Sequence, residues 1–311
     1  MRLFPDETTA SFVRRLEHAN ALATGQLTRT LHKSSRPWAD TLSAWTESDP
    51  SRLRLAMPQL AQQESLTIFD RRLLGRPNRR ISRLACRLCA HERGAVDRIE
   101  IYSTHESVVC PRHGLWLGEG VETPRNQMSV RTCPGVLAAA NHHRNLITRF
   151  GRVRVCTAFQ ISAYINRRWH DQGHHFDDFT GLHKNLIVTS GPDPTANYAI
   201  IAGALYPANA RLTAILASPF WTTITHSTRP DTFLNRVANE VTNGWFPEGG
   251  ADPLRRWMAE NWSPSFAGPD TISLPLTSTR IEAAPTISTK NASRTLAPRK
   301  TIPILDLPQL K

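Results

Sequence analysis

Apolar residues near the start of the chain recur at helical spacing. Four of them share one face of a predicted helix: Phe12, Val13, Leu16 and Ala19. Asp6 is a predicted N-cap ahead of this helix, and Glu7 adds a favourable charge in its first turn. Gly25 interrupts the pattern, and residues 27–31 restart it. A helix, a glycine-bearing turn and a second helix together predict a helix-turn-helix outline.

The pattern then changes to short helices and, in the middle of the chain, to strands. Over residues 36–70, short helical pieces are separated by three prolines: Pro37, Pro50 and Pro58. Residues 84–118 include five apolar residues with β-like character: Ile99, Ile101, Tyr102, Val108 and Val109. We predict two short strands there, joined by a turn at residues 104–106.

Helical periodicity returns from about residue 135. One predicted helix carries Leu137, Ala140, Ile147 and Phe150, and a second carries Ala158, Ile161, Ile165 and Trp169. Residues 171–192 are predicted to be a polar connection that contains histidine and glycine. Further helices are predicted over residues 196–204 and 208–217, on either side of Pro207. A later helix carries Phe233, Leu234, Val237 and Val241.

The end of the chain changes in composition. Asp252 followed by Pro253 predicts the N-cap and first residue of a final helix, which runs to about Trp262. From about residue 264, Pro, Ser, Thr, Ala and Lys dominate, which predicts a disordered, mildly basic tail. The longest apolar run, around residues 198–206, is too short to span a bilayer, so no membrane partner is expected.

Composition adds a strong positive charge to this picture. The 311 residues carry a formal net charge of +12, and the sequence pI is about 10.2. Such a surface attracts polyanions, because binding to phosphates releases counterions. One cluster, the arginine strip, leads into the first pair of cysteines: Arg71, Arg72, Arg76, Arg79, Arg80, Arg83 and Arg87. We interpret the arginine strip as a phosphate-contacting surface, and the alternative is a solvated face.

The cysteines carry a metal-binding pattern. Cys86 and Cys89 form C-x2-C, and after twenty residues Cys110 and His113 form C-x2-H. Two ligands separated by two residues can reach one ion from a tight turn, and two such turns complete a tetrahedron. Four protein ligands leave no open position, so the pattern predicts one structural zinc ion rather than a catalytic metal. His91 and His105 are alternatives to His113 as the fourth ligand.

The remaining histidines and cysteines bear on a second site and on the compartment. A second metal site could use one of two histidine groups: His142 and His143, or His170, His174, His175 and His183. The alternative is that these side chains are exposed or hydrogen-bonded. An odd total of five cysteines favours a reducing compartment over a disulfide scaffold. The N-terminus has no apolar stretch long enough for a signal peptide, so we expect a cytoplasmic protein.

Together these patterns predict a mainly α fold with a small β zinc-ribbon module. We divide the chain into four parts: a helical N-terminal region with helix-turn-helix character over residues 1–83, a zinc-ribbon-like module over 84–134, a helical domain over 135–263 and the disordered basic tail over 264–311.

Three stretches of the sequence carry a family resemblance. The opening segment PDETTASFVRRLEHANAL leads to the arginine-rich approach, then to CRLC and CPRHG. Within the opening segment the matching positions are Pro5, Glu7, Ser11, Arg15, Leu16 and Asn20. On these residues the chain resembles the TniQ family of transposition-associated proteins, which includes the TnsD-like target selectors. The resemblance covers roughly residues 5–150, and CPRHGLWL is its most specific part. Family members often carry a further CP-x-C pair, whereas here Cys133-Pro134 has no partner cysteine two residues on.

The resemblance implies a helix-turn-helix with a zinc ribbon, in which Cys86, Cys89, Cys110 and His113 are the ligands. It also implies DNA-linked target selection together with a transposase and an AAA+ ATPase. We therefore expect a non-catalytic DNA-binding adaptor of transposition, and a homodimer is one expected form. The alternatives are a zinc-containing transcription regulator or a protein-interaction scaffold. A metal-dependent nuclease is less favoured, because the acidic residues are scattered.

The predicted base-reading helix lies at residues 25–33 or at residues 156–169. The second candidate offers side chains that suit base or phosphate contact: Gln160, Asn166, Arg167 and Arg168. The alternative is that these residues cover a solvated face of an ordinary helix.

Overall fold

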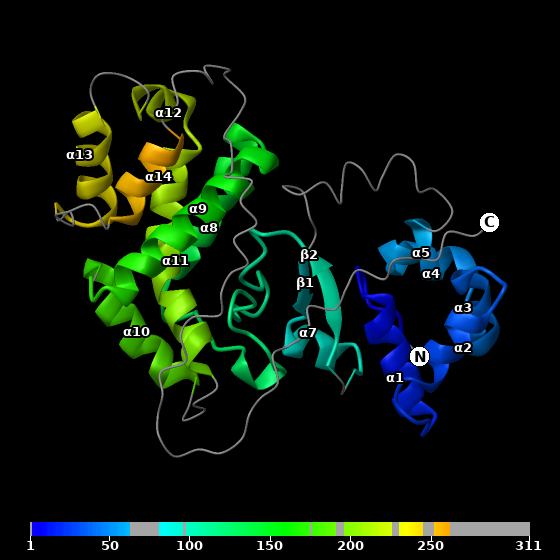
Figure 1. Ribbon diagram of the computed structural model, residues 1–311. Coiled ribbons are helices and arrows are strands. Elements are labelled where there is room, and N and C mark those ends of the chain that lie inside the picture. Colours follow the sequence, from blue (N-terminus) through cyan, green and yellow to red (C-terminus); the bar gives the residue numbers. More distant parts are fainter. Residues whose placement is uncertain are drawn as a thin grey trace, which may run out of the picture. The chain divides into compact units, whose positions relative to one another are not determined.

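The part of the chain that the structure describes is mostly helical, with one small antiparallel sheet (Figure 1). The computed structural model describes residues 2–62, 81–95, 98–174, 176–190, 196–225, 230–244 and 252–261. All of these residues fall in one compact unit, residues 1–274. The predicted fold class, mainly α with a small β module, is confirmed.

Residues 2–62 form five short helices that enclose a core of their own. These are α1 (Thr9–Ala19), α2 (Gln26–Lys33), α3 (Trp38–Thr46), α4 (Pro50–Ala56) and α5 (Pro58–Gln62). The core contains Phe12, Val13, Leu31, Leu42, Leu53 and Met57. Each predicted proline break marks a helix start, because proline fits the first turn, where its missing N–H is not needed.

The start of α1 differs from the sequence-based prediction. Thr8 is the N-cap, and its side chain accepts a hydrogen bond from the Ser11 amide at 3.1 Å. Asp6 does not cap the helix, because its φ of 58° places it in a turn before the helix begins. Glu7 also lies ahead of the helix and is buried. Ala19, predicted on the apolar face, is exposed.

The turn between α1 and α2 is organised by one carboxylate. Glu17 on α1 is buried and accepts hydrogen bonds from the backbone amides of Gly25 at 2.9 Å, Leu27 at 2.8 Å and Thr28 at 3.3 Å. Gly25 adopts a φ of 82°, which a glycine tolerates without strain. Glu17 therefore caps α2 from the preceding helix, and no side chain of α2 itself does so.

The sheet pairs two strands on either side of the first cysteine pair. Strand β1 (Ile81–Leu84) runs antiparallel to β2 (Glu100–Ser103), with Ile81 opposite Ser103. The predicted strand at Ile101 and Tyr102 is confirmed, but its predicted hairpin partner at Val108 and Val109 is wrong. Val109 instead forms an isolated bridge with Trp116. Short β1 escaped prediction because only its last residue, Leu84, is buried.

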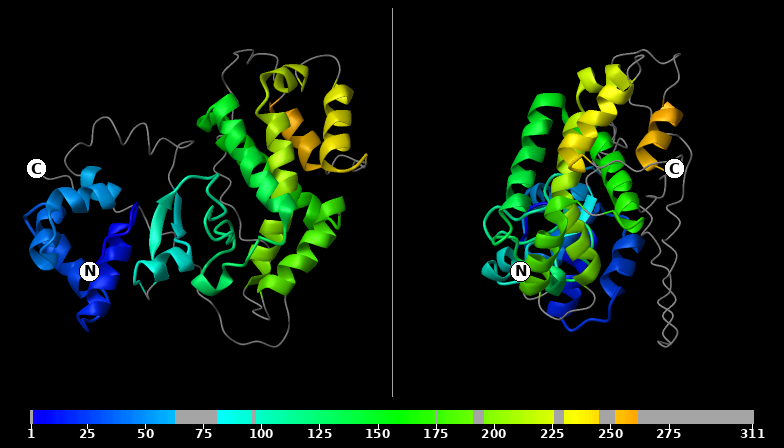
Figure 2. Two further views of the ribbon diagram at one scale, coloured as in Figure 1. Left: turned by 180° about the vertical axis from the view of Figure 1, so that it is seen from behind. Right: turned by 90° about the vertical axis from the view of Figure 1, so that its left-hand side faces the viewer.

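A buried polar network joins α1 to β2. Arg15 donates to both carboxylate oxygens of Glu7, at 2.9 and 2.7 Å, and the two side chains are only 6% and 1% exposed. Ser11 Oγ donates to Glu7 at 3.0 Å and accepts from the Glu100 amide at 3.0 Å. The Thr8 amide donates to the Glu100 carbonyl at 2.8 Å. Figure 2 shows the short blue helices beside the two cyan strands, and this network holds them there.

The remaining helices form the larger part of the structure. They are α8 (Pro134–Phe150), α9 (Arg152–Asp171), α10 (Asp177–Ser190), α11 (Asn197–Leu216), α12 (Pro219–Thr225), α13 (Pro230–Val241) and α14 (Pro253–Asn261). Helix α11 packs against α8, α9, α10 and α13 (Figure 1). The predicted final helix is confirmed, since Asp252 accepts from the amides of Leu254 and Arg255. It ends at Asn261.

Two predictions in this part are wrong, and one helix was missed. Residues 171–192 contain α10, whose Phe179, Leu182 and Leu186 are buried despite its polar composition. Helix α11 runs through Pro207 without a break, where two helices were predicted. Gly203 lies four residues before Pro207, at the position whose carbonyl the proline ring crowds. Helix α12 was not predicted.

Helix α11 is a core helix. It is 20 residues long, so the prediction that this apolar run is too short to span a membrane underestimated its length. Its length and hydropathy would suffice for a membrane span, but 78% of the apolar window is buried inside the protein. Burial against α8, α9 and α10 accounts for its composition.

Some predictions fall on residues outside the ranges given above. These are the tail over residues 264–311 and five members of the arginine strip: Arg71, Arg72, Arg76, Arg79 and Arg80. The four-part domain division stays a prediction, and so does the DNA-binding character of the helix-turn-helix outline.

Candidate metal centre

Four side chains converge on one point next to the sheet. One ligand atom from each of Cys86, Cys89, Cys110 and His113 lies within 4.8 Å of every other. His113 Nδ1 is 3.4 Å from Cys86 Sγ, 3.3 Å from Cys89 Sγ and 3.7 Å from Cys110 Sγ. The sulfur atoms of Cys89 and Cys110 are 3.8 Å apart. This Cys3His cluster could hold a metal ion.

The first ligand turn, residues 86–89, follows directly from β1. The Ala85 amide donates to the Ile99 carbonyl at 2.9 Å, which fixes the end of the strand. Cys86 is then the N-cap of the short helix α7 (Arg87–Glu92), and its carbonyl accepts from the Ala90 amide at 2.9 Å. The first turn of α7 brings Cys89 back beside Cys86, so both sulfur atoms face the same point.

The second ligand turn, residues 110–113, is closed by backbone hydrogen bonds. The Gly114 amide donates to the Cys110 carbonyl at 2.8 Å, and the Cys110 amide donates to the Leu115 carbonyl at 2.9 Å. Gly114 has a φ of 59°, and a Cβ there would lie 2.6 Å from Cγ of Arg131. Arg131 donates to the carbonyls of Arg112 and His113, both at 3.0 Å. Glycine and arginine together hold the turn that presents His113.

One buried side-chain amide braces the first ligand turn, and the residue after it contacts the segment that follows the second turn. Gln127 accepts a hydrogen bond from the Arg87 amide at 2.7 Å and donates to the Ala85 carbonyl at 2.7 Å. It is 1% exposed and follows the 3-10 helix η2 (Pro124–Asn126). The adjacent Met128 carbonyl accepts from the Trp116 amide at 2.9 Å, which ties the same segment to the strand-like residues after His113.

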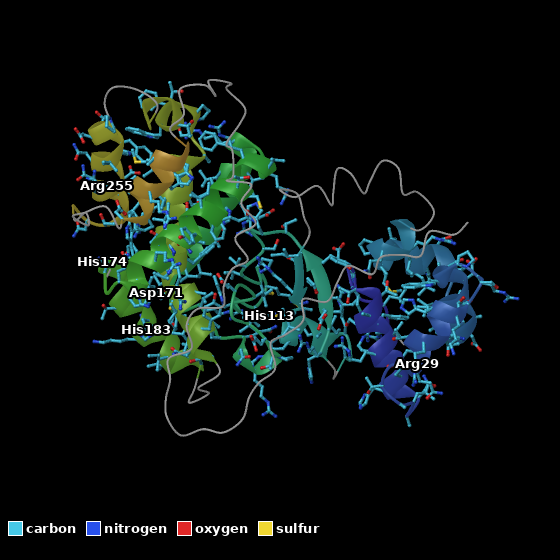
Figure 3. The ribbon with its side chains drawn as sticks, in the orientation of Figure 1. Arg29, His113, Asp171, His174, His183 and Arg255 are labelled. Carbon is cyan, nitrogen blue, oxygen red and sulfur yellow. The ribbon has the colours of Figure 1, made fainter. Side chains whose placement is uncertain are left out.

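The fourth ligand is held in orientation from its far side. His113 Nε2 lies 3.2 Å from Glu92 Oε1, and Arg112 pairs with the other oxygen of Glu92 at 2.7 Å. A carboxylate on the outer nitrogen leaves Nδ1 as the nitrogen that faces the sulfur atoms. Figure 3 labels His113 in the region of the two strands and α7.

The close packing of the three thiols raises the cost of ionising them unless a cation is bound among them. Burial raises the pKa of Cys89 to about 12, and the neighbouring sulfur atoms of Cys86 and Cys110 add to the increase. Burial also raises the pKa of Cys86. Burial alone would raise the pKa of Cys110 too, but the amides of His113 and Arg112 lower it overall. A divalent ion stabilises thiolates, so the donor set suits a metal.

Comparison with protein families identifies the domain that contains both ligand turns. Residues 1–117 match the sequence model of the TniQ family, a family of transposition-associated proteins. Those residues are a TniQ domain. The resemblance seen in the sequence is thereby confirmed, although the match ends at residue 117 and not near residue 150. No curated protein and no solved structure matches the chain. Both ligand turns lie inside the TniQ domain.

The alternatives to His113 are settled by position. The Cys3His cluster contains neither His91 nor His105. Across the described ranges, no other group of three or more such ligands comes together. His174 and His183 lie after α9 and on α10 (Figure 3). Cys133 is fully buried as the N-cap of α8 and belongs to no second ribbon in the described part of the chain.

A cluster of buried polar residues joins the TniQ domain to the helices that follow. His105 and Glu106, in the turn after β2, lie 3.6 Å apart, and Glu106 also pairs with Arg152 of α9. His143 of α8 is fully buried and shares a 2.9 Å hydrogen bond with the hydroxyl of Tyr206 on α11. Burial lowers the pKa of His105 to about 4 and that of His143 to about 3.

The residues predicted to contact DNA lie in different environments in the structure. Arg83, of the TniQ domain, donates to the carbonyls of His105 at 3.1 Å and Ser107 at 3.0 Å, so it braces a turn. Asn166 is fully buried and bonded to Asn209, so as a base contact it was wrong. Gln160 is exposed. Arg167 pairs with Asp171 at 3.0 Å, and exposed Arg168 lies over the ring of Tyr164.

Sequence reasoning missed the residues that support the ligands. Gln127, Glu92 and Arg131 act across long stretches of chain, and none stands in a recognisable spacing. Only the glycine after His113 gave a local signal, since a tight turn there needs positive φ. On α2, which covers most of the predicted base-reading segment 25–33, Arg29 is exposed and lies among the N-terminal helices (Figure 3).

Proposed function

We propose that this protein is a non-catalytic, DNA-binding adaptor that selects targets in transposition and is organised by one structural zinc ion. The TniQ domain carries the proposal, because its family is associated with transposition. The Cys3His cluster lies within that domain and stabilises the segment between β1 and the second ligand turn.

The distances in the cluster support zinc as the ion. With Zn–S near 2.3 Å and Zn–N near 2.0–2.1 Å, a tetrahedral ion separates its sulfur ligands by about 3.8 Å and sulfur from nitrogen by about 3.6 Å. The observed separations are 3.8 Å between Cys89 and Cys110 and 3.3–3.7 Å to His113. Four protein ligands fill a tetrahedron, which supports a structural role.

Charge supports DNA as the polyanionic partner. The net charge of +12 is large for 311 residues, and such a surface gains free energy by releasing counterions from a duplex. The arginine strip is a proposed part of this surface, with residues 71–80 the members to test first, since Arg83 is occupied by backbone carbonyls.

The proposed protein partners are a transposase and an AAA+ ATPase, and a homodimer is the proposed assembly. We place the protein in the cytoplasm. None of the five cysteines forms a disulfide, which agrees with a reducing compartment.

A salt-dependent mobility-shift assay with purified, zinc-loaded protein tests the proposal. We expect binding to duplex DNA whose affinity falls steeply as salt increases. Converting Arg79 and Arg80 to alanine should weaken binding to all sequences and flatten the salt dependence. No binding at low salt, with zinc content intact, would replace the adaptor by a protein-interaction scaffold.

A pull-down from the native host tests the partners. Recovery of a transposase or an AAA+ ATPase supports the adaptor. Recovery of transcription machinery alone, together with sequence-specific DNA binding, would favour a zinc-containing regulator instead.

A further inference from the structure

A long segment outside the TniQ domain is free of acidic residues. Between Glu122 and Asp171 the chain contains eight arginines and neither aspartate nor glutamate. Helix α8 lies wholly within this segment. Surfaces with one sign of charge attract the opposite charge, so an acid-free helix with an open face is a candidate for a polyanion contact.

Helix α8 has two distinct faces. Its inner face consists of Val136, Ala139, Ala140, His143 and Leu146, all buried as the helix packs against α9 and α11. Its outer face consists of Asn141, His142, Arg144, Asn145, Thr148 and Arg149, all exposed. At 100° per residue, these six positions occupy a continuous arc of about 160°. Over residues 141–149 this arc is therefore polar throughout, and Leu137, which shares the arc near the start of the helix, is partly buried against the core.

The side chains on the outer face are of the types that commonly contact nucleic acid in other proteins. Arginine pairs with guanine or phosphate, asparagine pairs with adenine, and threonine contacts either bases or phosphates. Arg144 donates to Asn141 one turn earlier, and Arg149 lies 4.9 Å from the centre of the Phe150 ring. Within the described structure neither guanidinium pairs with a carboxylate, so both positive charges stay available to an external anion.

Comparison with the other candidate helices favours α8. Helix α2 has only eight residues, and on α9 Arg167 is neutralised by Asp171 while Asn166 is buried. Helix α8 has 17 residues and is therefore about 25 Å long. A helix of ordinary diameter fits the major groove of B-DNA, which is about 12 Å wide.

We infer that the outer face of α8 docks against duplex DNA, with Arg144 and Arg149 on phosphates and the asparagines toward base edges. This inference rests on the proposed function and assigns its DNA contact to a helix outside the TniQ domain.

The test compares four forms of the full-length, zinc-loaded protein on a short duplex of mixed sequence over a series of salt concentrations. The double variant Arg144→Ala/Arg149→Ala should bind more weakly, and its salt slope should flatten by about 0.9 for each phosphate that is no longer neutralised. Arg144→Lys/Arg149→Lys keeps the charge and should keep the slope. Arg236→Ala, which removes an exposed arginine of α13, is the matched control and should leave the slope unchanged.

The outcomes separate this inference from the proposed function. If the wild-type protein binds and the alanine variant keeps its affinity and slope, the α8 inference fails while the DNA-binding adaptor stands. If the wild-type protein binds no duplex, both fail. Equal weakening in the lysine and alanine variants would show that packing, not charge, was disturbed, and would overturn the assignment of phosphate contacts. Circular dichroism of each variant checks that the helix content of the protein is unchanged.

Discussion

At the scale of single residues, the metal centre depends on donor atoms that cannot be replaced singly. Cys86→Ser should lower the zinc content and unfold or aggregate the middle of the chain, because a structural zinc contributes roughly 10–16 kcal/mol to such a module. Elemental analysis of the purified variant measures this. Cys133→Ser, at a cysteine outside the cluster, is the control and should keep its zinc. Unchanged zinc in Cys86→Ser would refute the ligand assignment.

Glu92 tests the orientation of His113. Its carboxylate contacts the outer nitrogen of the ring, so Glu92→Ala should weaken zinc binding by about 10–100-fold without removing a ligand. Competition with a chelator of known affinity gives the value. Glu122→Ala, at an exposed acid in a loop before η2, should bind zinc like the wild type. Equal affinities for all three proteins would make the Glu92 contact incidental.

The pair of Glu7 and Arg15 tests how much stability is lost when one partner of a buried ion pair is removed. Arg15→Met leaves a buried carboxylate without its partner, and should destabilise the fold by about 3–5 kcal/mol in urea unfolding. The double variant Glu7→Gln/Arg15→Met should lose much less stability than the two single variants added together. Arg14→Met removes the neighbouring, more exposed arginine and should cost about 0–1 kcal/mol. Additive losses of stability would argue against a coupled pair.

At the scale of elements, α2 depends on a cap supplied by α1. Glu17→Ala removes the acceptor of three backbone amides, and should destabilise α2 by about 0.5–2 kcal/mol. Hydrogen exchange at the amides of Leu27 and Thr28 should speed up accordingly. Lys33→Ala, at the other end of α2, is the comparison and should leave those two amides protected. Protection that survives in Glu17→Ala would assign the cap to another group.

Elements with a clear apolar period were predictable, and those defined by distant contacts were not. Helix α9 presents Ala158, Ile161, Ile165 and Trp169 on one face, and all four are buried. Helix α10 has too many polar residues for its apolar period to stand out. It is stabilised by three apolar residues, Phe179, Leu182 and Leu186, which are buried in the core. The pairing of β1 with β2 joins segments separated by the whole first ligand turn, so local pattern suggested a hairpin instead.

The same limit applies to the metal centre. Ligand spacing identified all four members of the Cys3His cluster, because spacing within each turn is a local property. The supporting contacts of Glu92, Gln127 and Arg131 each join residues far apart in the sequence, so no local spacing announces them. Burial also decided matters that residue type could not, since Asn166 suits base contact by chemistry and yet lies inside the helical core.

At the scale of the whole molecule, acid should loosen the junction between the TniQ domain and the helices. His105 and His143 are neutral in the folded state, with pKa values of about 4 and about 3, against 6.5 in the unfolded chain. Below pH 6.5 the unfolded state therefore binds more protons, and stability falls as pH decreases toward those values. From about pH 7 to about pH 5 the decrease in stability should be about 2 kcal/mol for each histidine.

Urea unfolding over this pH range, with zinc content monitored, measures the effect. His143→Gln keeps a polar partner for Tyr206 and should make the acid dependence shallower. His142→Gln, at the exposed neighbour, should keep the wild-type dependence. If the two variants show the same dependence on pH, the buried histidine is not its source.

The amide of Gln127 has a kinetic consequence. It holds the backbone of the first ligand turn at Ala85 and Arg87, and the adjacent Met128 carbonyl holds the Trp116 amide just after the second turn, so the two halves of the centre stay in register before any ion arrives. Capture of the ion can then proceed as a single encounter whose speed rises in proportion to ion concentration, with no slow rearrangement of the chain in between.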